Sequence, residues 1–295
     1  MDVVIVVILL LFGVVVGSFL NVIICRFNPE KGLIFKSLKG RSKCPKCNRQ
    51  LRWFELIPVI SFIIQLRKCR GCKNKISWQY PVVEILSAVI FVLVPVFLIS
   101  FYRLEFAVIN LNYLYLLSGF WVLIFLSWLV VTFIDLKHYI IPNKINLFIG
   151  FIGVLIVVSK IMMSDFILPF HNSFLRNYSI LFSPFENIVL NHALGALVAG
   201  GFFLLIFVLS KGRGVGLGDV KLMFFSGIAL GFPDVGLAMM ITFLLGGIWG
   251  GFLLITNKKD MKDSVPFGPL LILGMVITFF FGFEVVSFYF SLFGI

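Results

Sequence analysis

The chain has 295 residues, of which 60% are hydrophobic and only 13% are charged. Since an average soluble domain has about 25% charged residues, this composition excludes an ordinary soluble fold. Apolar runs of about 20 residues recur along the whole length, so the sequence predicts an all-α protein that crosses the membrane several times.

The net charge of +12 is concentrated in residues 26–79, which contain 14 Lys and Arg but only two acids. A basic soluble domain would suggest a nucleic-acid partner. Because this segment directly follows an apolar run, we interpret it as a cytoplasmic loop that obeys the positive-inside rule and attracts anionic lipid head groups. We therefore expect membrane lipids, and no nucleic acid, as its partners.

Eight apolar runs are predicted to span the membrane. The first is too long for the core of a signal peptide and has no basic segment before it, so we expect it to be retained. Its Gly13 and Gly17 would allow close helix packing. These features predict a first membrane helix (1–25), a basic insert (26–79) and a seven-helix membrane domain (80–295). The predicted spans are Val3–Cys25, Pro81–Phe101, Tyr113–Ile134, Ile145–Met163, Ile188–Leu209, Val220–Gly231, Val235–Ile255 and Phe267–Phe293.

The basic residues orient these spans. With the insert cytoplasmic and the N-terminus outside, 22 Lys and Arg lie inside and three lie outside. This orientation brings Asp135 and Asp219 to the same, cytoplasmic edge of the membrane. Besides the insert, the inner bases are Lys137, Lys144, Lys211, Arg213, Lys221, Lys258, Lys259 and Lys262, and the outer ones are Arg103, Lys160 and Arg176.

Four of the five cysteines form two C-x2-C pairs, which are separated by 21 residues. Such pairs present four thiolates to one tetrahedral ion and predict a closed, structural zinc site. Two disulfides are the alternative, which the reducing cytoplasm disfavours. The apolar stretch Leu56–Leu66 between the pairs is too short to span, so it packs inside the insert or lies at the membrane interface. The predicted ligands are Cys44, Cys47, Cys69 and Cys72.

Asp135 and Asp219 are the candidate catalytic residues. Two carboxyl groups close together in a water-poor site cannot both ionise easily, so one keeps a proton while the other is charged. The charged one can take a proton from water and the other can donate to a carbonyl oxygen, which is the chemistry of an aspartyl protease. Taken singly, Asp135 could merely end a span and Asp219 could be a helix N-cap.

Further residues are expected beside this pair. Gly216 and Gly218 would let the backbone approach a substrate, and Pro266 and Gly268 would break helical geometry at the same membrane edge. Lys221 is expected there as an inner basic anchor.

Histidines have no catalytic role in this interpretation. His138 is expected to be an interfacial polar residue, and His171 and His192 fall at the outer edge, far from the pair.

These motifs, in this order, resemble the bacterial type IV prepilin peptidases, a family of GxGD-class intramembrane aspartyl proteases. The resemblance covers nearly the whole chain, with one departure at Asn143, where the family often has a second acid. The motifs that carry it are Gly17–Ile23, the two C-x2-C pairs, Tyr80–Glu84, Ile134–Asp135 with His138 and Ile141–Pro142, Gly216–Leu222, and Pro266–Pro269.

The resemblance implies eight membrane helices in the bacterial inner membrane and a bifunctional enzyme. It would cut the basic leader from type IV prepilins and type II secretion pseudopilins at the cytoplasmic face. It would then methylate the new N-terminus with S-adenosylmethionine. By the same resemblance, Asp135 and Asp219 are the catalytic acids and the four cysteines bind zinc. The sequence itself contains no recognisable site for the methyl donor.

Three alternatives remain open. A transporter could use the aspartates as a proton relay, but the predicted spans contain few other polar residues. A non-catalytic pilus assembly factor would not need both aspartates. A GxGD-class leader peptidase without methyltransferase activity would differ only in the second reaction.

Overall fold

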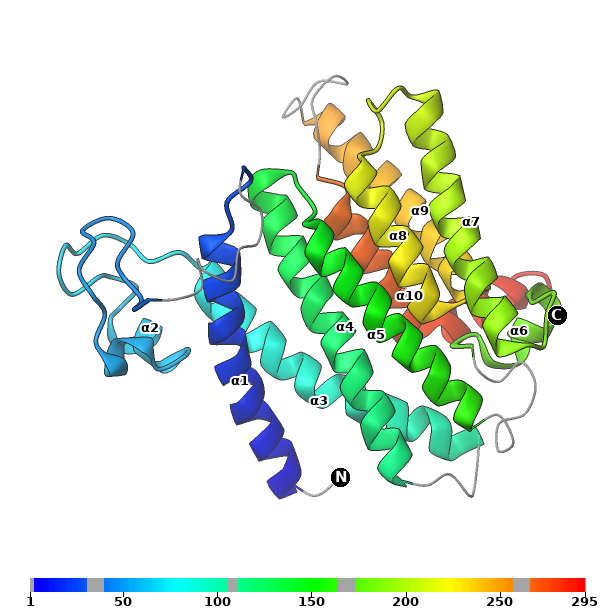
Figure 1. Ribbon diagram of the computed structural model, residues 1–295, viewed down its shortest axis with the longest axis horizontal. Helices are drawn as coiled ribbons and strands as arrows, with labels where there is room; N and C mark the ends of the chain where they lie inside the picture. The colour runs from blue at the N-terminus through cyan, green and yellow to red at the C-terminus, as the bar shows by residue number, and fades with distance from the viewer. Residues whose placement is uncertain (1–2, 31–39, 106–110, 164–172, 257–265, 295) are drawn as a thin grey trace. The chain divides into compact units, whose positions relative to one another are not determined.

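The computed structural model describes residues 3–30, 40–105, 111–163, 173–256 and 266–294 (Figure 1). Within these ranges the chain forms helices and turns with only isolated β-bridges, which confirms the predicted all-α class. The chain divides into two compact units, Met1–Ile99 and Ser100–Ile295. The predicted inner bases Lys258, Lys259 and Lys262, and His171, lie outside the described residues.

Seven helices of the described chain are long and apolar enough to cross a membrane. They have 20–28 residues each, which corresponds to about 30–42 Å at 1.5 Å per residue. The prediction of a multi-pass membrane protein is therefore confirmed. These helices are α1 (Val3–Arg26), α3 (Gln79–Glu105), α4 (Leu111–His138), α5 (Asn143–Met162), α7 (Ile188–Leu209), α9 (Asp234–Ile255) and α10 (Gly268–Ser291).

The remaining predicted span is helical but short. Helix α8 (Leu217–Leu230) has 14 residues, or about 21 Å, which is less than the hydrocarbon thickness of about 30 Å. Its C-cap is Gly231, whose φ of 82° is easily adopted only by glycine. Helix α8 is thus an eighth bundle helix that does not reach across the membrane alone.

In the first unit, α1 packs closely against α3 through two glycines. A Cβ atom added to Gly13 would lie 2.6 Å from Cα of Ala88, and one added to Gly17 would lie 2.7 Å from Cα of Glu84. Only glycine permits this approach of the two backbones. The expected role of both glycines in close packing is therefore confirmed.

Between α1 and α3, the described part of the insert contains a 3-10 turn at Trp53–Leu56 and the short helix α2 (Ile60–Ile64). The turn begins beside Arg49, which forms an ion pair with the buried Glu55. The described part of the insert has few buried apolar side chains.

In the second unit, α4 is the most buried of the long helices and packs against α5 and α10. Its N-terminal half packs in an aromatic cluster: the ring of Trp121 lies 4.8 Å from that of Phe279, and the ring of Phe174 lies 4.5 Å from that of Phe279. The two ring pairs are tilted, at 57° and 46°, and aromatic pairs at such distances contribute beyond simple burial. The segment before α7 adds a 3-10 turn (Arg176–Tyr178) and the short helix α6 (Ser179–Phe182).

Helix α8 packs along α7 and α5 (Figure 1). Small residues again set the distance, because a Cβ atom on Gly227 of α8 would lie 2.7 Å from the carbonyl oxygen of Gly195 of α7. On the other side, a Cβ atom on Gly153 of α5 would lie 3.1 Å from the backbone nitrogen of Ala229. Close packing on two sides holds α8 in place despite its short length.

Candidate active site

A hydrogen bond within the bundle shows that the two aspartates lie at one level. Nε1 of Trp128 on α4 donates to Oγ of Ser226 on α8 over 3.1 Å, and both side chains are buried. Asp135 comes seven residues after Trp128, and Asp219 comes seven residues before Ser226. Seven residues of helix correspond to about 10 Å. Because α4 approaches the aspartate level and α8 leaves it, both carboxyl groups lie about the same distance from this hydrogen bond.

Asp135 lies in the last turn of α4, rather than just beyond the helix as the predicted span implied. The helix ends three residues later, where Tyr139 has a φ of 55° and donates its N–H to the carbonyl oxygen of Asp135 over 2.8 Å. The Asp135 side chain is only 5% exposed. Its Oδ2 accepts a 3.1 Å hydrogen bond from the backbone N–H of Gly268, the first residue of α10.

Asp219 is the third residue of α8, so the alternative that it is the N-cap is wrong. Gly216 is the N-cap, and its N–H donates to Oδ2 of Asp219 over 2.9 Å. A carboxylate in the first helical turn is stabilised by the positive end of the helix dipole. The side chain is 9% exposed, and therefore it is almost as enclosed as Asp135.

Ile141, in the connection between α4 and α5, brings the two motifs together. A Cβ atom on Gly218 would lie 3.0 Å from Cβ of Ile141, and one on Gly268 would lie 3.2 Å from its Cδ1. The same atom on Gly268 would lie 2.7 Å from Oδ2 of Asp135. The two carboxyl groups are also close enough for the charge of Asp135 to interact electrostatically with Asp219. Three chain segments thus meet around two neighbouring carboxyl groups.

The other residues predicted near the pair have different positions. Lys221 is exposed, and its Nζ donates to Oδ1 of Asn143 over 3.0 Å. This bond links the start of α8 to the start of α5 at the position of the missing second acid. Pro266 is half-buried just before α10. His138 ends α4 and is half-buried.

The four predicted zinc ligands gather in one place in the insert. Their sulfur atoms all lie within 4.8 Å of one another, and those of Cys44 and Cys72 are 3.9 Å apart. A tetrahedral ion with Zn–S bonds of about 2.3 Å separates its sulfurs by about 3.8 Å, so the cluster fits a metal ion. None of the cysteines is in a disulfide.

The two C-x2-C pairs have matching backbone turns. In the first, Cys44 donates its N–H to Arg49 O over 3.0 Å; in the second, Cys69 donates to Asn74 O over 2.9 Å. An antiparallel bridge closes each turn. Two similar knuckles therefore present two sulfurs each to a common centre.

The thiols of this cluster differ in acidity. A backbone hydrogen bond from Cys47 lowers the pKa of Cys44 to about 6. The backbone N–H of Arg49 favours the thiolate of Cys47, but burial and the neighbouring sulfurs raise the pKa of Cys47 to about 11. Four thiolates are therefore stable together only when a cation neutralises them.

A buried polar network that sequence patterns did not reveal lies at the far end of α8. His192 of α7 bonds through Nδ1 to the carbonyl oxygen of Ile228 over 2.8 Å, and its Nε2 lies 3.4 Å from Nζ of Lys160. Ile228 comes nine residues after Asp219, or about 14 Å along the helix. The network is thus separate from the aspartate pair.

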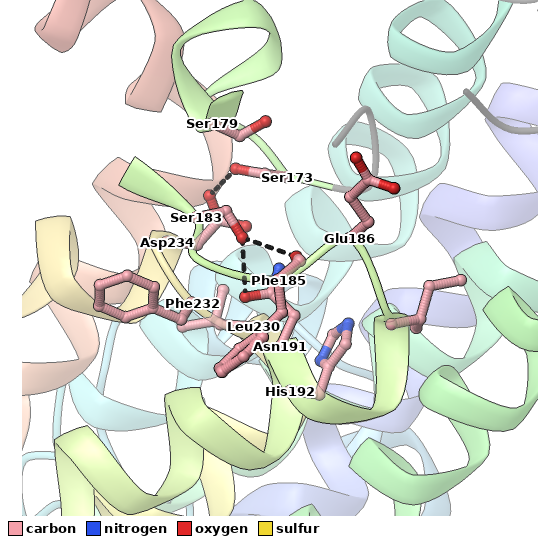
Figure 2. Close-up of a pocket in the computed structure, with 11 residues that line it drawn as sticks. Ser173, Ser179, Ser183, Phe185, Glu186, Asn191, His192, Leu230, Phe232 and Asp234 are labelled. Carbon is pink, nitrogen blue, oxygen red and sulfur yellow. Dashed lines mark hydrogen bonds between the residues drawn. The ribbon is translucent and has the colours of Figure 1, made fainter. Parts of the chain in front are cut away.

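Asp234, the first residue of α9, completes this network. It accepts hydrogen bonds from Oγ of Ser173 at 2.6 Å and from the N–H of Phe174 at 3.2 Å. Figure 2 shows Ser173 and Asp234 beside a cavity of about 10 Å³ that His192 also lines, with room for about one water. Lys160, counted as an outer flanking base in the sequence, is fully buried here.

Fold and site together define a multi-pass helical membrane protein with two enclosed carboxyl groups at one level of its bundle. The model of the bacterial peptidase A24 N-terminal domain matches residues 11–98, and the model of the type IV leader peptidase family matches residues 121–251. The chain therefore belongs to the type IV leader peptidase family.

Several relatives align over almost their full length. A protein of Bacillus subtilis is 29% identical over 283 residues, which cover 96% of each chain. Proteins of Aeromonas salmonicida and Legionella pneumophila are 27% and 28% identical, over 95% of this chain and 92% of theirs. All three are named prepilin leader peptidase/N-methyltransferase. No solved structure matches the chain significantly.

Proposed function

We propose that this protein is an aspartyl endopeptidase that removes the leader of type IV prepilins and pseudopilins and then methylates the new N-terminus. The observation that carries the proposal is that Asp135 and Asp219 lie at one level. The Oδ2 atom of each accepts a hydrogen bond from a backbone N–H. The names of the relatives supply the substrate class and the second reaction.

In the proposed hydrolysis, the two carboxyl groups share one proton. Repulsion between two enclosed carboxylates and their low exposure favour one ionised and one neutral group. The ionised carboxylate takes a proton from water, whose oxygen attacks the scissile carbonyl. The neutral carboxyl donates its proton to the carbonyl oxygen, which gives a tetrahedral intermediate. The first carboxyl then passes its new proton to the amide nitrogen, and the second takes a proton back from a hydroxyl of the intermediate as the C–N bond breaks. The backbone bonds from Gly268 and Gly216 fix one oxygen of each group, which leaves the other oxygen for water or substrate.

The remaining predicted residues have supporting roles in this proposal. Gly216 and Gly268 are donors to the two carboxyl groups, and Gly218 provides the close contact with Ile141. Lys221 links the start of α8 to the start of α5 through Asn143. Pro266 lies two residues before the start of α10.

We propose zinc as the ion in the four-cysteine cluster, because four thiolates suit its tetrahedral preference. Such a site has no open position, so the ion stabilises the insert and takes no part in hydrolysis. The proposed functional parts are then the first membrane helix (1–25), the zinc-binding insert (26–79) and the membrane domain that carries the aspartate pair (80–295). S-adenosylmethionine is proposed as the methyl donor from the relatives' names, with no residue assigned to it.

The proposed location is the bacterial inner membrane, with the N-terminus outside and the insert and both aspartates on the cytoplasmic side. The bias of 22 inner to three outer bases supports this orientation. A site at this edge suits a substrate whose leader is cytoplasmic and whose next segment lies in the membrane.

The test uses the purified full chain in lipid nanodiscs with a prepilin substrate and mass spectrometry of the product. We expect loss of the leader without a methyl donor, and one added methyl group at the new N-terminus when S-adenosylmethionine is present. Cleavage without methylation by a competent preparation would favour a leader peptidase without the second activity. No cleavage of any prepilin or pseudopilin would contradict the proposal.

A further inference from the structure

An exposed apolar surface lies on the insert, formed by Trp53, Leu56, Ile60, Ile63, Ile64 and Leu66. Trp53 and Leu66 are 78% and 79% exposed, and Ile63 and Ile64 are 64% and 65% exposed. These residues come from the 3-10 turn, from α2 and from the residues just after it. Side chains of this size gathered in one short stretch mark an interaction surface.

Helix α2 has two distinct faces. Phe62 turns toward Trp78, with ring centroids 5.2 Å apart, and the guanidinium of Arg67 lies 5.3 Å from the centre of the Trp78 ring. On this side Phe62 is half-buried against the rest of the insert. Ile60, Ile63 and Ile64 are exposed on the other side, so the structure does not support packing of the whole stretch inside the insert.

A hydrogen bond fixes the depth of α2 relative to the membrane. The N–H of Val59, just before α2, donates to Oε2 of Glu84 on α3 over 2.8 Å. Glu84 lies five residues inside the start of α3, or about 7 Å along its axis. The membrane-spanning part of α3, Gln79–Tyr102, covers about 36 Å and thus slightly exceeds the hydrocarbon thickness of about 30 Å. With α3 centred on the hydrocarbon layer, Glu84 and the start of α2 lie within a few ångströms of the boundary between hydrocarbon and head groups.

The charge around this surface is strongly positive. Residues 26–79 contain 14 bases and two acids, and one of these acids, Glu55, is buried in the ion pair with Arg49. Basic residues beside a membrane are attracted to anionic lipids, and tryptophan favours the head-group region. The exposed bases nearest in sequence are Arg52, Lys68, Arg70, Lys73 and Lys75.

We infer that the apolar surface of the insert docks into the head-group region of an anionic lipid leaflet beside α1 and α3. The apolar side chains enter the boundary with the acyl chains while the flanking bases contact lipid phosphates. This is the arrangement of an interfacial amphipathic segment, with the two spans as its tether. The insert is thereby held against the membrane at three places: α1, α3 and α2.

The experiment measures Trp53 in the full-length protein by its fluorescence. The proteins are placed in nanodiscs whose lipids are brominated at defined acyl positions. Subtracting the emission spectrum of Trp53→Phe from that of the wild type gives the fluorescence of Trp53 alone. We expect at least a twofold loss of the Trp53 signal with bromine near the head groups in membranes rich in phosphatidylglycerol. The loss should be clearly smaller in phosphatidylcholine alone, and high salt should reduce the difference.

Matched variants control for other causes. Trp249 of α9 is half exposed on a membrane-spanning helix, so the Trp249→Phe difference should show quenching that does not depend on lipid charge. The double variant Ile63→Ser, Ile64→Ser should lose the quenching of Trp53 but keep its metal, which would show that the insert still folds.

Two results would overturn the inference. If aqueous acrylamide quenches Trp53 but bromolipid does not, Trp53 faces water. If neither quencher acts on Trp53, it is covered by protein. Equal bromolipid quenching in neutral and anionic membranes would overturn the assignment of an anionic surface.

Discussion

The backbone N–H of Gly268 donates a 3.1 Å hydrogen bond to Oδ2 of Asp135. This bond joins the start of α10 to the last turn of α4, across 133 residues of sequence. It fixes the orientation of one carboxyl group of the proposed pair.

Gly268→Ala tests this contact. The new Cβ would lie 2.7 Å from Oδ2 of Asp135, so the carboxyl group must move. We expect leader cleavage to slow by roughly 100-fold, because small displacements of a catalytic group have effects of this size. Gly247→Ala is the control, since its Cβ would meet nothing within 4 Å. Equal cleavage rates of the two variants in nanodiscs would contradict the role of Gly268.

The hydrogen bond between Trp128 and Ser226 is expected to stabilise the two helices that carry the aspartates. Ser226→Ala leaves the buried indole N–H of Trp128 unpaired, which costs about 1–3 kcal/mol. The control is Ser127→Ala, because that hydroxyl bonds only to Leu123 O of its own helix at 2.7 Å. Thermal unfolding in detergent should separate the two variants. A Ser226→Ala protein as stable as the wild type would rule out this contribution.

Metal binding is expected to depend on the clustered cysteines alone. Cys44→Ser and Cys69→Ser should each lose the metal, because three thiolates remain where four bind. Cys25 lies outside the cluster, so the Cys25→Ser protein should keep the metal. Metal content per chain of the purified proteins, measured by atomic emission, gives the answer. Metal retained by Cys44→Ser, or absent from the wild type, would argue against a four-cysteine site.

Asp234 is expected to contribute to stability rather than to cleavage. Asp234→Ala removes the acceptor for Ser173 and Phe174 and leaves Lys160 without its nearby acid, for a cost of roughly 3 kcal/mol. The exposed Glu186 lines the same cavity, and Glu186→Ala should change stability by about 0.5 kcal/mol or less. The midpoints of thermal unfolding in detergent measure the stabilities of the two variants relative to the wild type.

Adding Lys160→Met to Asp234→Ala separates the two parts of this cost. The second substitution should restore part of the lost stability, because it removes the buried charge that Asp234 had stabilised. A double variant less stable than Asp234→Ala would mean that Lys160 and Asp234 do not depend on each other.

The sequence predicts most of this fold because long apolar runs and their flanking bases are local signals. The run Ile188–Leu209 coincides with α7, and Asp135 and Asp219 are conspicuous as acids at the ends of apolar runs. The length of α8 is less predictable, because packing against α5 and α7 decides how far a helix must reach.

Burial by several helices is the part that the sequence does not reveal. Lys160 resembles an outer flanking base in the sequence, yet its charge is enclosed with His192 and Asp234 from two other helices. The bonds from Gly268 to Asp135 and from Trp128 to Ser226 likewise join segments about a hundred or more residues apart. No local pattern encodes such contacts.

The most direct measurement for the proposed aspartate pair is prepilin cleavage by Asp135→Asn and Asp219→Asn, each purified in nanodiscs and compared with wild type. Asparagine keeps the shape of the side chain but can neither accept the proton from water nor donate an acidic one. We expect each variant alone to lose cleavage by roughly 100- to 10,000-fold while keeping its unfolding temperature and metal content. Cleavage at the wild-type rate by either variant would contradict the pair mechanism.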